Sequence, residues 1–197
     1  MPKIVDHDQR RRELAEAAWT VILRDGIDGA TTRQIARQSG YSAGVLSHYF
    51  ESKDDILLEA LRFSHTIINE RLGSMLEHQT GFRALRTFCY DTVPLNAEQA
   101  RETQLEISFW SRALVKDSLR RVQLAESSYW RGILLDVIIA AQELDELVDG
   151  DPQIMTDVLA GLIDGLSVHA LLFPDRYDEK HLIKLIDAQL ALWSTAT

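Results

Sequence analysis

The scarcity of helix breakers constrains this chain more than any other feature. Its 197 residues include only 4 prolines and 10 glycines, and the segments between them carry apolar residues at helical spacing. Long helices can therefore run without interruption, whereas a sheet-rich fold would need many tight turns. No strand-like alternation and no internal repeat competes with this pattern. The sequence predicts an all-α fold of about nine helices.

The first fifty or so residues contain an unusual density of helix starts and stops. Apolar residues at helical spacing predict a first helix over 8–25 and a short second helix over 33–39. A third is expected over 43–50, and a fourth begins near residue 53 with two acids in its first turn. The boundary residues are Gly26, Thr31, Thr32, Gly40, Ser42 and Ser52, each a preferred cap or stop. This pattern predicts a three-helix N-terminal domain over residues 1–53.

Longer helices are expected beyond this domain. The fourth helix would join the two domains without a flexible linker, and a rigid connection can transmit movement. The predicted ranges are 53–78, 81–93, 97–114, 117–144, 152–173 and 178–194, separated by glycine, proline or aspartate. They predict a C-terminal helical bundle domain over residues 54–197.

The charge of the chain is distributed unevenly between these two domains. The net charge is −9, but residues 1–53 carry eight Lys and Arg against seven Asp and Glu, a balance of +1. The other 144 residues carry thirteen against twenty-three, a balance of −10. Only the N-terminal domain has a balance compatible with a polyanionic partner.

Several classes of protein are disfavoured by what the sequence lacks. The single Cys89 excludes an intramolecular disulfide framework and a multi-cysteine zinc site. His65, His78 and His169 show no metal-ligand spacing, and we predict no metal and no cofactor. No window approaches the ~18 apolar residues of a membrane span. The start MPKIVDHDQRRR has no apolar signal region, so we expect a cytoplasmic protein without a membrane partner.

The segment from Thr32 to Phe50 has the spacing of a helix-turn-helix. Ala36 is small where two helices cross closely, and Gly40, four residues later, permits a sharp turn through positive φ. Leu46, Tyr49 and Phe50 would form the inward stripe of the following helix. The outward face then carries the short side chains of Ser42, Ala43, Gly44 and Ser47, together with His48.

Such a face suits the major groove of a DNA duplex. Short side chains let a helix lie deep in the groove, where Val45 would contact a thymine methyl group and His48 a phosphate or base. Arg33 is the candidate for a bidentate contact with guanine. Thr32 and Lys53 lie at helix N-termini, where backbone N–H groups also bind phosphate.

The segment RRRELAEAAWTVILRDGIDGATTRQIARQSGYSAGVLSHYFESKDDILLEAL resembles the N-terminal domain of the TetR family of transcriptional repressors. The similarity lies in the TT-R-x-IA core, the glycine before the recognition helix and the YF-x-SK-x-x-L ending. Ser47 stands where the family often has tyrosine, and Ser39 replaces a common alanine, which affects the expected operator sequence. By this resemblance the DNA contacts are Thr32, Arg33, Ser42, Ala43, Gly44, Ser47, His48, Tyr49 and Lys53.

The last two predicted helices have wide apolar surfaces. Gly161 and Gly165 lie four residues apart, and each costs about 1 kcal/mol relative to alanine inside a helix. Close approach of a second helix would offset this cost, so we predict half of a four-helix dimer interface. The alternative is that both helices are simply the core of a monomer. The predicted dimer residues are Leu159, Gly161, Leu162, Gly165, Leu166, Leu182, Ile186, Leu190 and Trp193.

The C-terminal segment GLIDGLSVHALLFPDRYDEKHLIKLIDAQLALW, with ISFWSRAL, is similar to the choline-responsive regulators within the TetR family. One helix face could present Glu102 and Glu106 beside Phe109 and Trp110, with Tyr129 and Trp130 as a second wall. Carboxylates beside aromatic rings suit a cationic effector. In the alternative arrangement the buried stripe is Thr103, Ile107, Trp110 and Leu114, and both glutamates lie in water.

These patterns together predict a homodimeric repressor that binds a palindromic double-stranded operator. A small effector would tilt the fourth helix, change the distance between the two DNA-binding domains and release the DNA. One competing hypothesis is an all-helical enzyme, which no nucleophile, base or metal constellation supports. The other is a helical interaction protein whose N-terminal domain no longer binds DNA.

Overall fold

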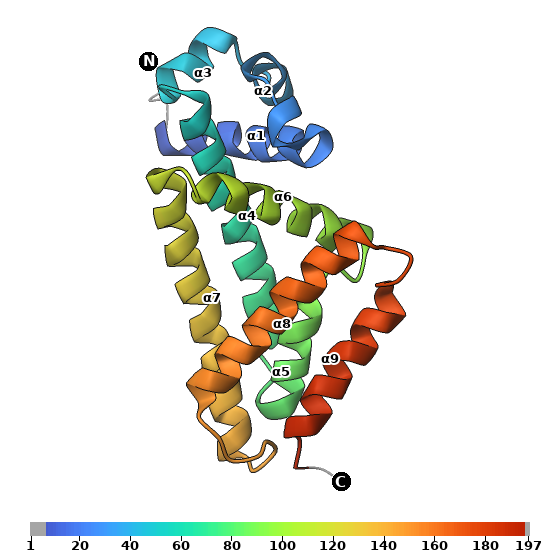
Figure 1. Ribbon diagram of the computed structural model, residues 1–197. Coiled ribbons are helices and arrows are strands. Elements are labelled where there is room, and N and C mark those ends of the chain that lie inside the picture. The colour runs from blue at the N-terminus through green and yellow to red at the C-terminus, as the bar shows by residue number, and fades with distance from the viewer. Residues whose placement is uncertain (1–6, 196–197) are drawn as a thin grey trace. The chain divides into compact units, whose positions relative to one another are not determined.

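The computed structural model describes residues 7–195, so the first six residues of the start discussed above lie outside it. Within this range the chain forms helices and no named strand, with one isolated β-bridge between Leu147 and Ser194. The helices are α1 (His7–Gly29), α2 (Thr32–Ser39), α3 (Ala43–Tyr49), α4 (Lys53–Leu76), α5 (Gly81–Thr92), α6 (Ala97–Ala113), α7 (Asp117–Glu143), α8 (Pro152–Leu172) and α9 (Glu179–Trp193) (Figure 1). The predicted all-α class with about nine helices is confirmed.

The chain divides into two compact units. The first, which we call the head unit, comprises the chain up to Ile67 together with Ser108–Gln123. The second, the body unit, comprises Ile68–Ile107 and the chain from Leu124 onward. Three helices, α4, α6 and α7, therefore contribute residues to both units.

Apolar residues at helical spacing on α1 contribute to the core of the head unit. Leu14, Ala18 and Val21 are each 0% exposed. The helix was expected to end at Gly26, which has non-helical φ 75° and ψ 167°. A further turn follows this kink, because the Ala30 N–H donates to the carbonyl oxygen of Gly26 at 3.0 Å. Gly26 therefore ends the first helical run as predicted, and α1 continues beyond this break as a separate short turn.

The body unit is built around α5 and α8. In Figure 1, α8 and α9 run in opposite directions and are joined by a short turn, and α5 also contacts α9. The N-terminus of α5 is capped from a distant loop, where the Glu146 carboxylate accepts from the Phe82 N–H at 2.6 Å. Gly81 is required there, because its φ is +62° and a β-carbon would lie 2.0 Å from a Glu146 oxygen.

One expectation about α8 needs correction. By length and composition this helix could cross a membrane, with a mean hydropathy of 1.4 over its 18-residue window, whereas we expected no such segment. Core helices pass the same test, and 44% of the window is buried inside the protein. The buried residues of α8 belong to the core of the body unit, among them Met155, Leu159, Ile163 and Leu166. We therefore interpret α8 as a core helix.

Candidate functional site

The first helix of the predicted helix-turn-helix, α2, begins with a complete N-terminal cap. The Thr31 hydroxyl accepts from the Gln34 N–H at 3.3 Å, and the Gln34 side chain accepts from the Thr31 N–H at 3.0 Å. This reciprocal pair satisfies two donors that a helix start otherwise leaves unpaired. Thr32 and Arg33, the first two residues after the cap, are exposed.

The turn between α2 and α3 depends on Gly40. This residue has φ 74° and ψ 7°, the left-handed conformation, and its N–H donates to the carbonyl oxygens of Ala36 and Arg37. The Tyr41 N–H also donates to Ala36, at 3.1 Å, which completes a Schellman-type ending. A β-carbon at Gly40 would meet nothing within 4 Å, so the requirement for glycine is purely conformational.

The second helix of the pair, α3, begins at a serine cap. The Ser42 hydroxyl accepts from the Val45 N–H at 3.3 Å. Leu46 and Phe50 face inward, at 2% and 5% exposure. The outward residues predicted from the sequence, Ser42, Ala43, Gly44, Ser47 and His48, are all exposed, while Val45 and Tyr49 are half-buried. The helix thus presents a narrow polar face of small side chains to solvent.

An arginine from α1 fixes the end of α3. Arg11 donates to the Tyr49 carbonyl oxygen at 3.1 Å and to Glu59 at 3.0 Å, and its guanidinium lies 5.0 Å from the Phe50 ring centre. Burial raises the pKa of Glu59, but the hydrogen bond and charge of Arg11, with the charge of Arg62, outweigh it and lower the pKa. Arg11 therefore positions α3 within the head unit.

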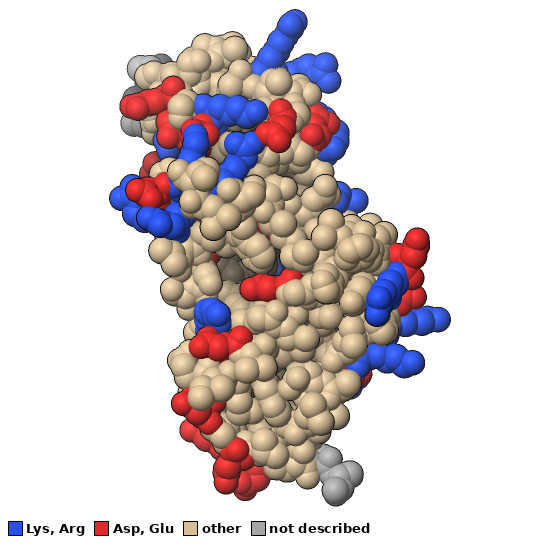
Figure 2. All heavy atoms as spheres, in the orientation of Figure 1, with Lys and Arg blue, Asp and Glu red and all other residues tan. Residues whose placement is uncertain are grey.

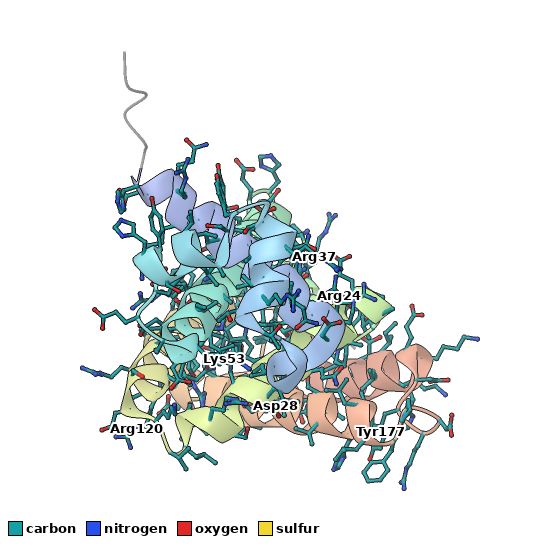
Figure 3. All side chains as sticks on the ribbon, turned by 90° about the horizontal axis from the view of Figure 1, so that it is seen from above. Arg24, Asp28, Arg37, Lys53, Arg120 and Tyr177 are labelled. Carbon is teal, nitrogen blue, oxygen red and sulfur yellow. The ribbon has the colours of Figure 1, made fainter. Side chains whose placement is uncertain are left out.

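The start of α4 offers a second exposed helix N-terminus. The Ser52 hydroxyl accepts from the Asp55 N–H at 3.2 Å, and Asp55 accepts from the Ser52 N–H at 3.1 Å. Lys53 is exposed directly after this cap. Figure 3 shows Lys53 on α4 and Arg37 on α2, so cationic side chains come from separate helices of the head unit. Arg37 is also exposed, although it was not among the DNA contacts predicted above.

His7 was missed by the sequence reasoning. Its ring centre lies 4.6 Å from that of Tyr49 and 5.8 Å from that of His48. This places the exposed first turn of α1 beside the last turn of α3. No local pattern could reveal the contact, because the residues are more than forty positions apart in the chain.

A buried ionic cluster joins three helices of the body unit. Arg71 on α4 donates to Asp91 on α5 at 3.0 Å and to both carboxylate oxygens of Glu102 on α6 at 2.9 Å. The Asp91 and Glu102 side chains are 4% and 8% exposed. Glu102, which the sequence suggested for effector binding, is thus held by Arg71. The sequence reasoning did not select Arg71 or Asp91.

The other residues suggested for effector binding have different surroundings. Phe109 is fully buried and belongs, with half-buried Trp110, to the head unit. Glu106 is half-buried in the body unit, and Tyr129 is 56% exposed. The ring centre of Trp130 lies 5.0 Å from that of Phe88, a core residue. The six residues therefore do not form one cluster within either unit.

The residues predicted for dimerisation separate into two groups. Five of them, Leu159, Leu166, Leu182, Ile186 and Leu190, are at most 6% exposed and belong to the core of the body unit. Leu162 and Trp193 are half-buried, and Gly161 and Gly165 are exposed. On α8, the residues Ile154, Val158 and Leu172 are 61%, 49% and 65% exposed. Figure 2 shows a largely uncharged face over α8.

Comparison with protein families decides the classification. Residues 14–60 match the model described as bacterial regulatory proteins of the tetR family. Residues 83–193 match the model of the C-terminal domain of BetI-type transcriptional repressors, which covers more than half of the chain. The chain belongs to the TetR family. The resemblance found in the sequence, including the choline-responsive subset, is confirmed.

Individual TetR-family relatives align over nearly the whole chain. The regulator PksA of Bacillus subtilis is 31% identical over 188 residues, which cover 94% of this chain and 90% of PksA. BetI of Serratia proteamaculans is 29% identical over 191 residues, covering 94% and 92%. Both are named as helix-turn-helix transcriptional regulators. This TetR-family chain is therefore a DNA-binding regulator of transcription and not an enzyme.

A solved structure supports the fold. A putative transcriptional regulator from Saccharomonospora viridis, in complex with choline, matches with a TM-score of 0.85 and 24% identity. The match covers 93% of this chain and 96% of that one.

Proposed function

We propose that this TetR-family protein is a cytoplasmic, homodimeric repressor that binds a palindromic operator and leaves it when a small effector binds. The observation that carries the proposal is the exposed, capped helix α3. Its five outward residues are small or polar, and their backbone can approach the base edges of a major groove.

The exposed ends of α2 and α4 extend this surface. Arg33 has the planar donor group that pairs with guanine, while Thr32 and Lys53 lie at N-terminal helix ends suited to phosphate. His48 and Tyr49 complete the proposed contact set at the end of α3. The surface combines contacts that position the protein with contacts that read bases, as sequence-specific binding requires.

The proposal of a dimer rests on the exposed stripe of α8. Ile154, Val158, Gly161, Gly165 and Leu172 recur at intervals of three, four and seven residues, so they share one face of the helix. A β-carbon at either glycine would meet nothing within 4 Å in the protomer. Close packing against the same helix of a second copy would use that space. The head units of the two protomers could then contact two operator half-sites whose centres lie about one turn of DNA apart.

The proposed route from effector to DNA uses α4. This continuous helix begins at Lys53, in the proposed DNA surface, and carries Arg71 in the body unit. Within the head unit, Asp54 of α4 also forms an ion pair with Lys116 at the turn between α6 and α7. An effector that shifts Arg71 would tilt the helix. A coupling of about 1–3 kcal/mol between the two states suffices for control.

The experiment begins with selection of bound fragments from random or genomic DNA, followed by titration of the selected duplex. The double variant Arg33→Ala with Lys53→Ala should lose at least tenfold in affinity, because it removes a bidentate base contact worth about 1–3 kcal/mol together with a phosphate contact. The control is Arg83→Ala with Arg101→Ala, which removes the same charge from exposed sites in the body unit. Equal affinities for the two double variants would contradict the proposed DNA surface, whereas failure to select any bound duplex would support the interaction-protein alternative.

A further inference from the structure

Three aromatic rings meet where the first turn of α1 lies beside the last turn of α3. The ring centre of His7 lies 4.6 Å from that of Tyr49 and 5.8 Å from that of His48. The His48 and Tyr49 ring centres are 5.5 Å apart, and their planes are perpendicular. Both histidines are exposed, whereas Tyr49 is half-buried. The two imidazoles therefore form an exposed pair, which we call the histidine pair.

The histidine pair lies at the edge of the proposed DNA surface. His48 is one of the outward residues of α3, and His7 brings a second imidazole to it from α1. Arg11 donates to the Tyr49 carbonyl oxygen at 3.1 Å, which fixes the last turn of α3 against α1. At least half of the hydrogen bonds between proteins and DNA go to phosphate and sugar, and they set the register of the protein on the duplex. The position of the pair suits such a contact beside the groove.

An imidazole complements the charge of a phosphate when it is protonated. Histidine gains a proton readily near neutral pH, and the protonated ring donates from both nitrogens. Two protonated rings with centres 5.8 Å apart would repel each other in the free protein. A phosphate beside both rings would offset this repulsion and accept charge-assisted hydrogen bonds. DNA binding and protonation of the pair should therefore favour each other.

The other charged side chains around the pair are of kinds that ordinarily titrate outside the range from pH 6 to 8. Carboxylates, ammonium groups and guanidinium groups keep one charge there, whereas imidazole does not. The charged residues on the adjoining segments are Asp8, Arg10 and Arg11 on α1, Glu51 after α3, and Lys53 and Glu59 on α4. Arg11 and Glu59 form an ion pair at 3.0 Å. A change of charge at this site near neutral pH therefore comes from the imidazoles.

We propose that His7 and His48 together bind an operator phosphate and take up a proton when they do so. The inference rests on the proposed DNA-binding surface, extends it from α3 onto α1, and makes operator affinity depend on pH. Because a proton is taken up on binding, the affinity rises as the pH falls, by up to about tenfold per pH unit for each full proton.

Titration of the selected operator at pH 8, 7 and 6 and constant ionic strength tests the inference. The affinity of the unaltered protein should rise at least about tenfold from pH 8 to pH 6, and that of His7→Gln less than about threefold. His78→Gln makes the same change at an exposed site in the body unit and should keep the full rise. A pH-independent affinity of the unaltered protein, or an equal rise in His7→Gln, would overturn the inference.

Calorimetry counts the protons directly. The heat of operator binding, measured in two buffers with different ionisation enthalpies, should report uptake of about one proton per half-site at pH 7. The same measurement on His7→Gln should report less than half of this uptake. A contact that involves no proton would lower the affinity of His7→Gln equally at every pH and leave the two heats consistent with no uptake, which would overturn the proton linkage.

A neutral backbone analogue identifies the partner of the pair. Methylphosphonate replaces the phosphates of one half-site singly, and one position should reduce the pH dependence as far as His7→Gln does. If no position has this effect, the phosphate assignment is wrong.

Failure of this inference is distinguishable from failure of the proposed function. Selection of no bound duplex would reject both together. Operator binding with a flat pH response would reject the histidine pair and leave the repressor proposal intact.

Discussion

Helices α3 and α8 both expose one face, but the two faces differ in chemistry. The exposed residues of α3 are small and polar, and their side chains leave the backbone accessible. The exposed stripe of α8 carries Ile154 and Val158 beside two glycines. A polar face of small side chains suits contact with hydrated DNA. An apolar face in which glycines separate larger side chains suits packing against a second protein surface. The difference agrees with our proposal that α3 reads DNA and that α8 forms the dimer interface.

The largest expected effect concerns the polar face and its phosphate contacts. If each dimer makes 6–10 phosphate contacts, operator affinity should fall about 10³–10⁵-fold between 50 and 200 mM salt. Fluorescence anisotropy on the selected operator measures this directly. A flat response would mean that phosphate contacts do not dominate docking. The dimerisation constant should change far less over the same range, because the α8 stripe is apolar.

The next effect tests the ionic cluster of the body unit. Arg71→Met leaves Asp91 and Glu102 buried without their cation, which should lower the free energy of unfolding by about 3–5 kcal/mol. Urea denaturation followed by circular dichroism measures the change. Arg83→Met, at an exposed site on the same unit, is the control and should change stability by about 0.5 kcal/mol or less. Similar losses in both variants would show that the cluster contributes little.

Substitutions at two exposed glycines, one on the α8 stripe and one on α4, test the apolar face of α8. Gly161→Leu places a large side chain on the α8 stripe, where the protomer has open space but a closely packed partner would not. Overpacking costs about 1–3 kcal/mol, so dimer affinity should fall about 5- to 150-fold in sedimentation experiments. Gly73→Leu adds the same side chain at another exposed helical glycine with open space and should leave the dimer intact. An unchanged dimer in Gly161→Leu would exclude this stripe from the interface.

The smallest stability effect concerns the turn before α3. Gly40→Ala forces an L side chain into the left-handed conformation and should cost about 1–2 kcal/mol of folding free energy. Gly44→Ala, in the helical backbone of α3, meets only the Ser42 hydroxyl at 3.7 Å and should stabilise by up to about 1 kcal/mol. Thermal unfolding of both variants measures the contrast. A Gly40→Ala protein as stable as the unaltered chain would show that this conformation is not required.

The sequence predicts local features well, because caps and periodicity are local. The expected helices 81–93 and 152–173 differ from Gly81–Thr92 and Pro152–Leu172 by a single residue. The exposure of Ser42, Ala43, Gly44, Ser47 and His48 is also confirmed, although their contact with DNA stays a prediction.

Long-range features could not be predicted in the same way. Arg71 meets Asp91 and Glu102 across 20 and 31 positions, and no spacing rule connects three helices. The apolar surface of α8 presented a similar problem, because periodicity identifies a wide apolar helix but not which side a neighbouring helix covers. Leu159 and Leu166 proved to be core residues, while Ile154 and Val158 remained exposed.

A chemical footprint on the selected operator tests whether two α3 helices occupy the major groove. Two paired heads that insert α3 should protect two major-groove segments whose centres lie about 34–36 Å apart on one side of the duplex. Ala43→Glu would place a carboxylate at the groove floor, so both protected segments should disappear while the dimer persists. Protection that survives in this variant, or a single protected segment in the unaltered complex, would contradict this mode of binding.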